Sequence, residues 1–214
     1  MKKHILYLAI ISIVLPFNVL QAQKELTFDD QFNGTYTAKS FGPARWIDGG
    51  KGYTTLERSK ETNGQDIVRY ASANGIRTIL VKASELIPEG KTAPLTIADY
   101  IWSNDATQLL IFTNTQRVWR YNTKGDYWVM DLKTRQLKQL GKGLKPSSLM
   151  FAKFSPDGVY VAYVSEKNVY VEHLEKGNVR PLTTDGGGNI VNGTFDWVYE
   201  EELDCRDGFR WSPD

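Results

Sequence analysis

The sequence predicts an all-β protein built from consecutive four-stranded antiparallel sheets. Residues 150–183 alternate runs of β-branched and aromatic residues with turns of Gly, Asn, Pro and Lys, a composition typical of strands joined by tight turns. An aromatic residue followed by a turn recurs at Trp46, Trp102, Phe154 and Trp211, with spacings of 56, 52 and 57 residues. Helical periodicity is scarce. A repeat of this length with four strands in each unit predicts the blades of a β-propeller.

The clearest repeat unit spans residues 150–183. Its first turn, Ser155-Pro156-Asp157-Gly158, has proline second and glycine fourth, the positions that a type I turn favours. Further turns at 165–168 and 175–178 separate the remaining apolar runs. The predicted strands are Met150–Phe154, Val159–Val164, Val169–His173 and Val179–Thr183.

The other copies of the motif begin at Arg45, Ile101 and Arg210. Residues 23–214 are therefore predicted to hold about three blades of a partial β-propeller. The last copy stops at Asp214, before the glycine and strand that should complete its turn. Three blades do not close a ring and would expose an apolar sheet face. We expect the chain to be the N-terminal part of a longer polypeptide.

The first 22 residues have the layout of a secretory signal peptide. Lys2 and Lys3 precede the apolar stretch Ile5–Leu20, and Ala22 offers a small residue for cleavage. The alternative is a retained membrane anchor, but the apolar stretch is shorter than the roughly 20 residues that span a bilayer. We expect cleavage after Ala22 and export to the periplasm or the exterior.

Charge and cysteine content narrow the function classes. With Lys2 and Lys3 removed from the 26 basic residues, 24 remain against 25 acidic ones. No basic excess exists for binding nucleic acid. The single cysteine, Cys205, excludes an internal disulfide, and so few cysteines in an exported chain suit a bacterial periplasm.

The segment Asp196-Trp197-Val198-Tyr199-Glu200-Glu201-Glu202-Leu203 is the most informative one. It lies in a link of about 23 residues, 185–207, where two to six are usual, and long ordered links tend to be functional. Asp196 is predicted to cap a short helical turn, with the aromatic residues packed on the propeller. Adjacent carboxylates repel one another, and a cation such as a peptide's N-terminal ammonium would relieve that repulsion. A solvated acidic helix edge is the alternative.

A second candidate is Arg120, which lies between Trp119 and Tyr121, ahead of a predicted strand at 127–132. Such an arginine either stacks on a ring or donates hydrogen bonds to a carbonyl or carboxylate. Catalytic machinery is missing, since there is no Gly-x-Ser-x-Gly turn. His173 is expected to be an ordinary surface histidine on a strand. One Cys and one His after the signal peptide fit no zinc site, and no cofactor site is predicted; Gly186-Gly187-Gly188 is interpreted as a flexible loop tip.

Together, the acidic segment, the Trp119-Arg120 pair about 80 residues before it and the blade repeats resemble the N-terminal part of the dipeptidyl peptidase IV family. These are serine exopeptidases of the prolyl oligopeptidase group. The likeness covers essentially the whole chain after the signal peptide, including Leu26–Phe32 and Arg45-Trp46. The acidic segment is specific to the family, whereas the repeats alone fit many propellers.

The resemblance implies an eight-bladed propeller followed by an α/β-hydrolase domain, with the substrate bound between them. Glu201 and Glu202 would bind the N-terminal ammonium of a peptide, so that the enzyme releases Xaa-Pro or Xaa-Ala dipeptides. Arg120 would hold a substrate carbonyl, and Glu200 would be structural. The catalytic Ser, His and Asp would follow residue 214, leaving this segment without activity of its own. A homodimer is possible.

Two rival functions remain from the sequence. One is a non-catalytic propeller that binds protein partners, with the glutamates forming a surface patch. The other is a related exopeptidase of different specificity. Both the dipeptidyl peptidase and the related exopeptidase would require a Gly-x-Ser-x-Gly turn after four or five more blades, whereas the non-catalytic propeller would not.

Overall fold

The computed structural model describes residues 26–38 and 42–213, so the predicted signal peptide lies outside the described residues. The chain divides into two compact units, residues 1–40 and 41–214. In the first unit, α2 (Phe28–Phe32) follows Thr27, whose hydroxyl accepts a hydrogen bond from the Asp30 N–H at 3.2 Å. Among the described residues, no helix has the length and apolar character needed to cross a membrane.

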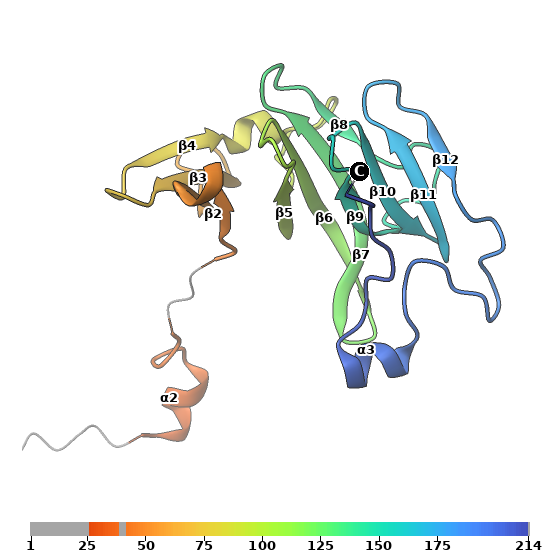
Figure 1. Ribbon diagram of the computed structural model, residues 1–214. Coiled ribbons are helices and arrows are strands. Elements are labelled where there is room, and N and C mark those ends of the chain that lie inside the picture. Colours follow the sequence, from red (N-terminus) through yellow and green to blue (C-terminus); the bar gives the residue numbers. More distant parts are fainter. Residues whose placement is uncertain (1–25, 39–41, 214) are drawn as a thin grey trace, which may run out of the picture. The chain divides into compact units, whose positions relative to one another are not determined.

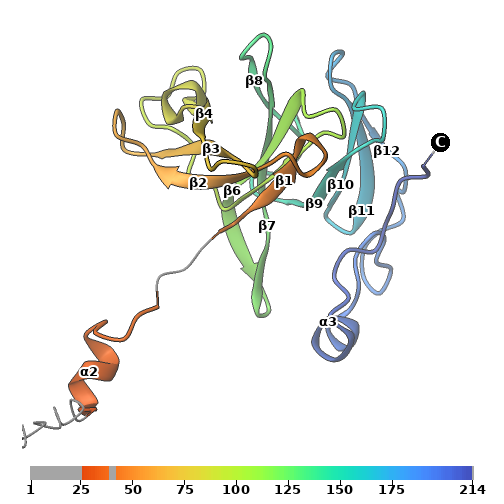
Figure 2. The same cartoon turned by 60° about the vertical axis from the view of Figure 1, so that its left-hand side comes forward.

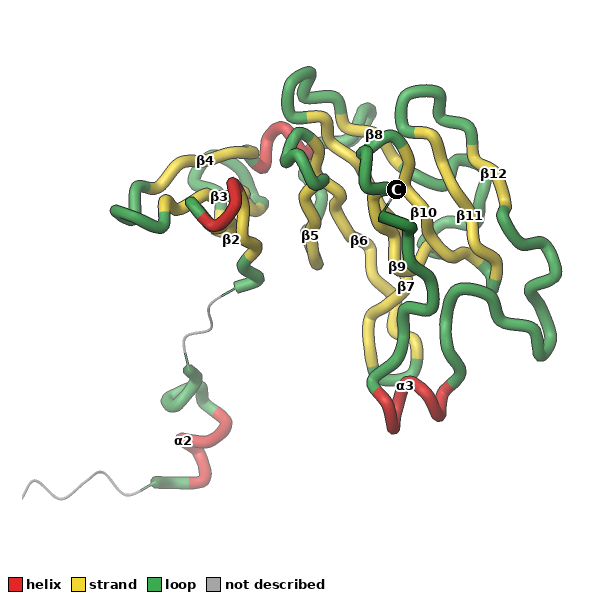
Figure 3. Tube along the Cα trace, in the orientation of Figure 1, coloured by secondary structure: helices red, strands yellow, loops and turns green. Residues whose placement is uncertain are grey.

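The regular structure of the second unit is mainly strands, drawn yellow in Figure 3. Its first sheet is antiparallel, in the order of the sequence, and begins with the predicted motif strand at Arg45. The 3-10 helices η1 (Asp48–Gly50) and η2 (Ala83–Leu86) flank this sheet. The strands are β1 (Arg45–Ile47), β2 (Gly52–Arg58), β3 (Gln65–Ala71) and β4 (Arg77–Val81).

The second sheet contains two further four-stranded units that share one short strand pairing (Figure 1). Its order is β12-β11-β10-β9-β7-β6-β5, with β8 pairing β7. The junction is short, because only Lys124 and Gly125 of β7 pair with Met150 and Leu149 of β9. The strands are β5 (Asp99–Trp102), β6 (Gln108–Val118), β7 (Tyr121–Asp131), β8 (Leu137–Gln139), β9 (Leu149–Phe154), β10 (Tyr160–Ser165), β11 (Asn168–His173) and β12 (Val179–Pro181).

The strands predicted for residues 150–183 are confirmed, with ends that differ by one or two residues. The predicted turn is also present, because the Gly158 N–H donates to the Ser155 carbonyl at 2.9 Å. The fourth copy of the motif is different, since residues 208–213 form no strand. Side chains hold this copy against β9 instead: Lys153 Nζ donates to the Phe209 carbonyl at 2.9 Å, and Trp211 Nε1 to the Lys153 carbonyl at 3.2 Å.

The core explains why the repeat units stack face to face. Along β6, Leu109 belongs to a cluster that includes residues of the first sheet, whereas Leu110 belongs to one that includes β9 and β10. Successive strand residues point to opposite faces, so the β5–β8 unit is covered by apolar side chains on both sides. The first cluster contains Ile67, Val81, Leu86, Ile97, Tyr100, Leu109, Ile111 and Met130, and the second Leu110, Tyr127, Val129, Leu140, Leu149, Ala152, Val161 and Tyr163.

Candidate functional site

The acidic segment forms α3 (Trp197–Leu203), as the sequence predicts. The Asp196 carboxylate caps it by accepting a hydrogen bond from the Tyr199 N–H at 3.1 Å. The helix ends at Asp204, which has a left-handed backbone with φ of 54° and donates its N–H to the Tyr199 carbonyl. One short helix therefore presents all three glutamates, held at each end by its own caps.

The link that carries α3 is fastened at several points. An isolated bridge pairs Thr194 with Asp207, so the two ends of the α3 loop lie together. The Gly186 N–H donates to Asn168 Oδ1 at 2.9 Å, and a Cβ at Gly186 would lie 2.2 Å from the Lys167 carbonyl oxygen. The interpretation of this glycine run as a flexible loop tip is wrong at Gly186, because glycine is needed there for close packing.

The aromatic residues hold α3 less than the sequence suggests. Phe195 stacks on Tyr199 with ring centroids 5.6 Å apart, but Trp197 and Tyr199 remain about half exposed. The expectation that Phe195, Trp197 and Tyr199 pin this segment to the propeller therefore holds only in part, since two of the three residues expose about half of their surface to solvent. Ion pairs to its glutamates supply the remaining contacts.

Arg120 lies at the tip of the long hairpin formed by β6 and β7. Each strand has 11 residues, and the tip reaches the neighbourhood of α3 in both Figure 1 and Figure 2. Trp119 takes a positive φ of 50° at the turn, and its carbonyl accepts a hydrogen bond from Arg117 Nε at 2.8 Å. Arg120 therefore precedes β7 directly, and the strand begins at Tyr121 rather than near residue 127.

The hairpin brings Arg120 into contact with Glu201, the second glutamate of the acidic run. Arg120 Nε lies 2.7 Å from Glu201 Oε1, although that oxygen has no hydrogen bond of acceptable geometry. The contact is thus an ion pair without a directed hydrogen bond. The Glu201 side chain is 8% exposed and the Arg120 side chain 67% exposed, so the carboxylate is enclosed while much of the guanidinium faces solvent.

Glu200, the first acid, is buried at 6% exposure. Its Oε1 lies 3.7 Å from Nε of Arg206, and neither atom has a hydrogen-bond partner. Burial raises the pKa of Glu200, and the charge of Arg206 opposes that rise. Burial and the contact with Arg206 are compatible with the structural role expected for Glu200, which stays a prediction.

Glu202 differs from its two neighbours. Its side chain is exposed, and within the described residues it takes part in none of the ion pairs that α3 makes. The hypothesis of three mutually repelling carboxylates is therefore wrong for two of them, because Arg120 and Arg206 supply positive charge to Glu201 and Glu200. Only Glu202 presents a carboxylate without such a partner.

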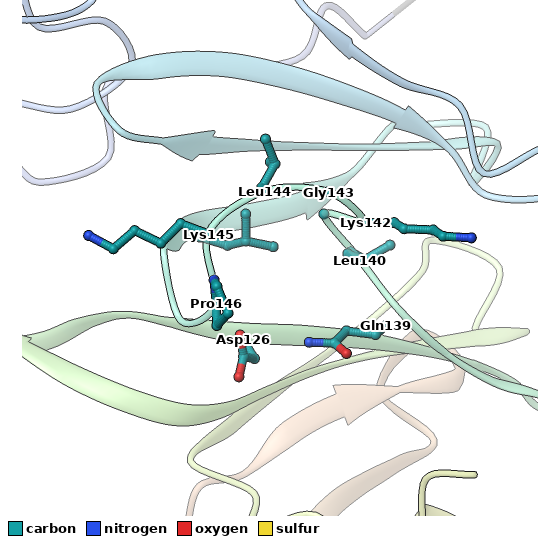
Figure 4. Close-up of a pocket in the computed structure, with 10 residues that line it drawn as sticks. Asp126, Gln139, Leu140, Lys142, Gly143, Leu144, Lys145 and Pro146 are labelled. Atoms are coloured by element: carbon teal, nitrogen blue, oxygen red, sulfur yellow. The ribbon is translucent and has the colours of Figure 1, made fainter. Parts of the chain in front are cut away.

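A cavity of about 310 Å³ lies between the hairpin tip and α3. Its walls are mainly apolar and include Trp119, Phe151 and Trp197. Its polar lining comes from Lys167, Thr194, Asp196, Glu200 and Arg206. Another cavity, of about 400 Å³, lies away from these residues, along the loop after β8. Figure 4 shows that Lys142 and Lys145 of this loop extend in opposite directions, so they do not form one anion site.

Three residues with a structural part were missed in the sequence. Arg206 and Tyr121 lie beside the candidate site, and Glu172 is a buried acid elsewhere, on β11. Arg206 follows the acidic run, and its position between two aspartates, Asp204 and Asp207, was the available signal. Tyr121 was noted only as a neighbour of Arg120, but its ring lies 3.7 Å from the Arg206 guanidinium carbon. Glu172 had no signal, since an acid at an alternate strand position normally faces solvent. His173 is an ordinary histidine, packed edge-on against Tyr160, and no metal-binding cluster occurs in the part of the chain described.

The chain is similar to known dipeptidyl peptidases. It is 29% identical over 201 residues to "Probable dipeptidyl-aminopeptidase B" of Arthroderma gypseum, covering 89% of this chain and 21% of that protein. It is also 29% identical over 201 residues to the protein of the same name from Penicillium rubens, covering 89% of this chain and 22% of the relative. The chain thus spans about a fifth of the length of these relatives.

A solved structure agrees with this relationship. The crystal structure of Porphyromonas gingivalis dipeptidyl peptidase 4 superposes with a TM-score of 0.73 at 29% identity, over 86% of this chain and 26% of that one. The partial β-propeller predicted from the repeats is therefore the observed fold. A family profile described as the dipeptidyl peptidase IV (DPP IV) N-terminal region matches residues 103–214, more than half of the chain. The chain belongs to the dipeptidyl peptidase IV family, within its N-terminal region.

Proposed function

We propose that this segment binds the free N-terminus of a peptide substrate for an exported serine dipeptidyl peptidase. Glu201 and Glu202 accept hydrogen bonds from the substrate ammonium, and Arg120 holds a carbonyl of the bound peptide. The enzyme releases Xaa-Pro or Xaa-Ala dipeptides. Its α/β-hydrolase domain, with the catalytic Ser, His and Asp, follows residue 214 in the same polypeptide, and the signal peptide is removed after Ala22.

The ion pair between Arg120 and Glu201 carries this proposal. These residues lie in different repeat units, and their contact at 2.7 Å brings a donor for a carbonyl beside an acceptor for an ammonium. Arg120, Glu201 and Glu202 together carry one net negative charge. A bound ammonium would neutralise it, which favours a cationic ligand over an anionic one.

The enclosure of Glu201 weighs against a solvated acidic edge, and against a surface patch on a non-catalytic propeller. Such an edge has no reason to keep a carboxylate at 8% exposure, because burial of a charge is unfavourable unless the charge is paired. Glu202 remains exposed beside it, available to a ligand. A dipeptidyl peptidase also agrees with the names of the relatives.

Steady-state kinetics on the full-length protein would test the proposal. Glu202→Gln is the cleanest variant, because it keeps size and breaks no ion pair seen among the described residues. A charge-assisted hydrogen bond contributes about 1.5–3 kcal/mol, so kcat/KM for a free Xaa-Pro reporter should fall roughly tenfold to a hundredfold. Glu201→Gln should lower it similarly, whereas Glu175→Gln, an exposed acid in the β11–β12 turn, should have no effect.

The loss should be confined to substrates with a free amino group. An N-acetylated peptide has no ammonium, so Glu202→Gln should leave its slower cleavage unchanged. Wild-type kcat/KM on the free reporter for both Glu201→Gln and Glu202→Gln would refute the ammonium site.

A further inference from the structure

Arg206 lies between the two structural elements that carry the proposed substrate site. Its guanidinium carbon lies 3.7 Å from the centre of the Tyr121 ring on β7. Its Nε lies 3.7 Å from Glu200 Oε1 on α3, and its Nη2 contacts the Asp204 carboxylate at the end of that helix. The side chain is only 22% exposed, and it lines the cavity between the hairpin tip and α3.

The residues that Arg206 contacts are chain neighbours of the site residues. Tyr121 follows Arg120, and Glu200 precedes Glu201. A displacement of Tyr121 from the helix would therefore carry Arg120 away from Glu201. The Arg120 side chain is itself two-thirds exposed, and an ion pair with one solvent-facing partner and no directed hydrogen bond holds two elements together weakly.

The charge of Glu200 favours this position of the Arg206 side chain. The Glu200 carboxylate is buried, and its Oε1 has no hydrogen bond. A buried charge without a compensating charge is strongly unfavourable. Among the described residues Arg206 is the cation that forms an ion pair with this carboxylate, so removal of Arg206 leaves Glu200 to be protonated or to turn toward solvent. In either case the charge contact that joins the first turn of α3 to Arg206 is lost.

We propose that Arg206 is a positioning residue for the ammonium site. By stacking on Tyr121 and balancing the charge of Glu200, it sets the spacing between the β6–β7 tip and α3, and thus between Arg120 and Glu201. The role rests on the proposed function of those residues. Arg206 makes no contact with substrate in this scheme and acts through its two neighbours.

The first test is structural and independent of catalysis. In a crystal structure of full-length Arg206→Ala, the separation of Arg120 Nε and Glu201 Oε1 should exceed 4 Å, the limit of an ion pair. Arg206→Lys should fail to restore the contact, because an ammonium lacks the planar stacking group. Tyr121→Phe is the matched control, since its ring still accepts the stacked guanidinium. An unchanged 2.7 Å contact in Arg206→Ala would overturn the positioning role.

The second test is kinetic. Arg206→Ala should raise KM for a free Xaa-Pro substrate by roughly tenfold with a smaller change in kcat, while Tyr121→Phe stays near wild type. Added to Glu201→Gln, Arg206→Ala should cause little further loss, because the residue acts through a site already impaired. A fully additive loss would indicate a general effect on folding and refute the inference.

The two hypotheses fail in different ways. If Glu201→Gln and Glu202→Gln retain full activity while Arg206→Ala separates Arg120 from Glu201, the ammonium site is wrong and the positioning geometry is right. If the glutamate variants lose activity while Arg206→Ala leaves the ion pair intact, the substrate site stands and the positioning role is wrong.

Discussion

Glu200 and Glu201 are consecutive on α3, yet their carboxylates meet different arginines. Glu200 Oε1 lies 3.7 Å from Arg206 Nε, and Glu201 Oε1 lies 2.7 Å from Arg120 Nε. One arginine comes from the chain just after the helix and the other from the tip of a distant hairpin. The acidic run is therefore divided among partners, which leaves Glu202 exposed for a ligand.

Arg120 and Glu201 should behave as one unit in catalysis. In the full-length protein, Arg120→Ala should lower kcat/KM for free and N-acetylated peptides together, because its proposed partner is a carbonyl. The double variant Arg120→Ala with Glu201→Gln should lose less than the two single effects combined, since each single change already disturbs the pair. Kinetics of the four proteins measure the coupling. Strict additivity would contradict a shared site.

Burial of Glu200 should give stability a specific pH dependence. Burial raises its pKa above the ordinary value of 4.5. A raised pKa means that the carboxyl stabilises the fold fully below the pKa of the unfolded chain, and that this contribution is lost as pH rises through the folded pKa. Glu200→Gln does not titrate there. The melting temperature of wild type should therefore fall relative to Glu200→Gln as pH rises from about 4 to 8.

Arg206 is the necessary control for that measurement. Arg206→Gln removes the positive charge that opposes the rise of the Glu200 pKa. The stability of this variant should therefore decline more steeply with rising pH than the stability of wild type. If the melting temperature of wild type instead rises relative to that of Glu200→Gln as the pH rises, the pKa of Glu200 is lowered in the folded protein.

The core between the repeat units should be sensitive to truncation of single side chains. Leu110 on β6 is 1% exposed in the second cluster, whereas Ile101 on the adjacent β5 is 42% exposed. Leu110→Ala should lower the free energy of unfolding by about 2–5 kcal/mol, as buried leucines do. Ile101→Ala, a comparable truncation in the same sheet, should change it by about 0.5 kcal/mol or less. Chemical denaturation of the full-length protein measures both, and equal effects would contradict the burial of Leu110 in the second cluster.

The sequence predicts the local structure well because turns and strands here depend on neighbouring residues. The turn at Ser155, the strands on either side of it and the Asp196 cap all follow from side-chain types within a few positions. The sequence predicted the candidate site residues but not the ion pair between Arg120 and Glu201. Nothing local to Arg120 indicates that β6 and β7 continue to 11 residues each, which is the feature that carries Arg120 to α3.

Tertiary contacts account for the rest. In the sequence, Arg206 is one charge in a run of mixed charges. Its importance becomes visible only in the fold, where the hairpin places Tyr121 beside it. Phe154 and Trp211 share a sequence motif, but only the first lies in a strand. Around Trp211 the chain is held by the Lys153 side chain, which donates to the Phe209 carbonyl, and by the Lys153 carbonyl, which accepts from Trp211 Nε1, rather than by a ladder of strand hydrogen bonds. No local pattern distinguishes the two cases.

Glu172 provides a final test, because it is a fully buried acid at the junction of two repeat units. Its Oε2 accepts hydrogen bonds from the Gly141 N–H at 2.8 Å and from the Tyr163 hydroxyl at 3.0 Å. Gly141 belongs to the loop of Figure 4, so this carboxylate fastens that loop to β11. Burial, reinforced by the charge of Glu172, also raises the pKa of Tyr163 far above its ordinary value, which keeps the hydroxyl protonated as a donor.

Glu172→Ala should therefore leave two buried donors without an acceptor. Each unsatisfied group costs about 1–3 kcal/mol, so the free energy of unfolding should fall by roughly 2–6 kcal/mol, while Tyr163→Phe removes one donor and should cost less. Glu172→Gln retains an acceptor oxygen for Gly141 and Tyr163 and should fall between wild type and Glu172→Ala. Denaturation of the three full-length variants ranks them. If Glu172→Ala is no less stable than Glu172→Gln, the two hydrogen bonds do not hold the loop, and the burial of this acid needs another explanation.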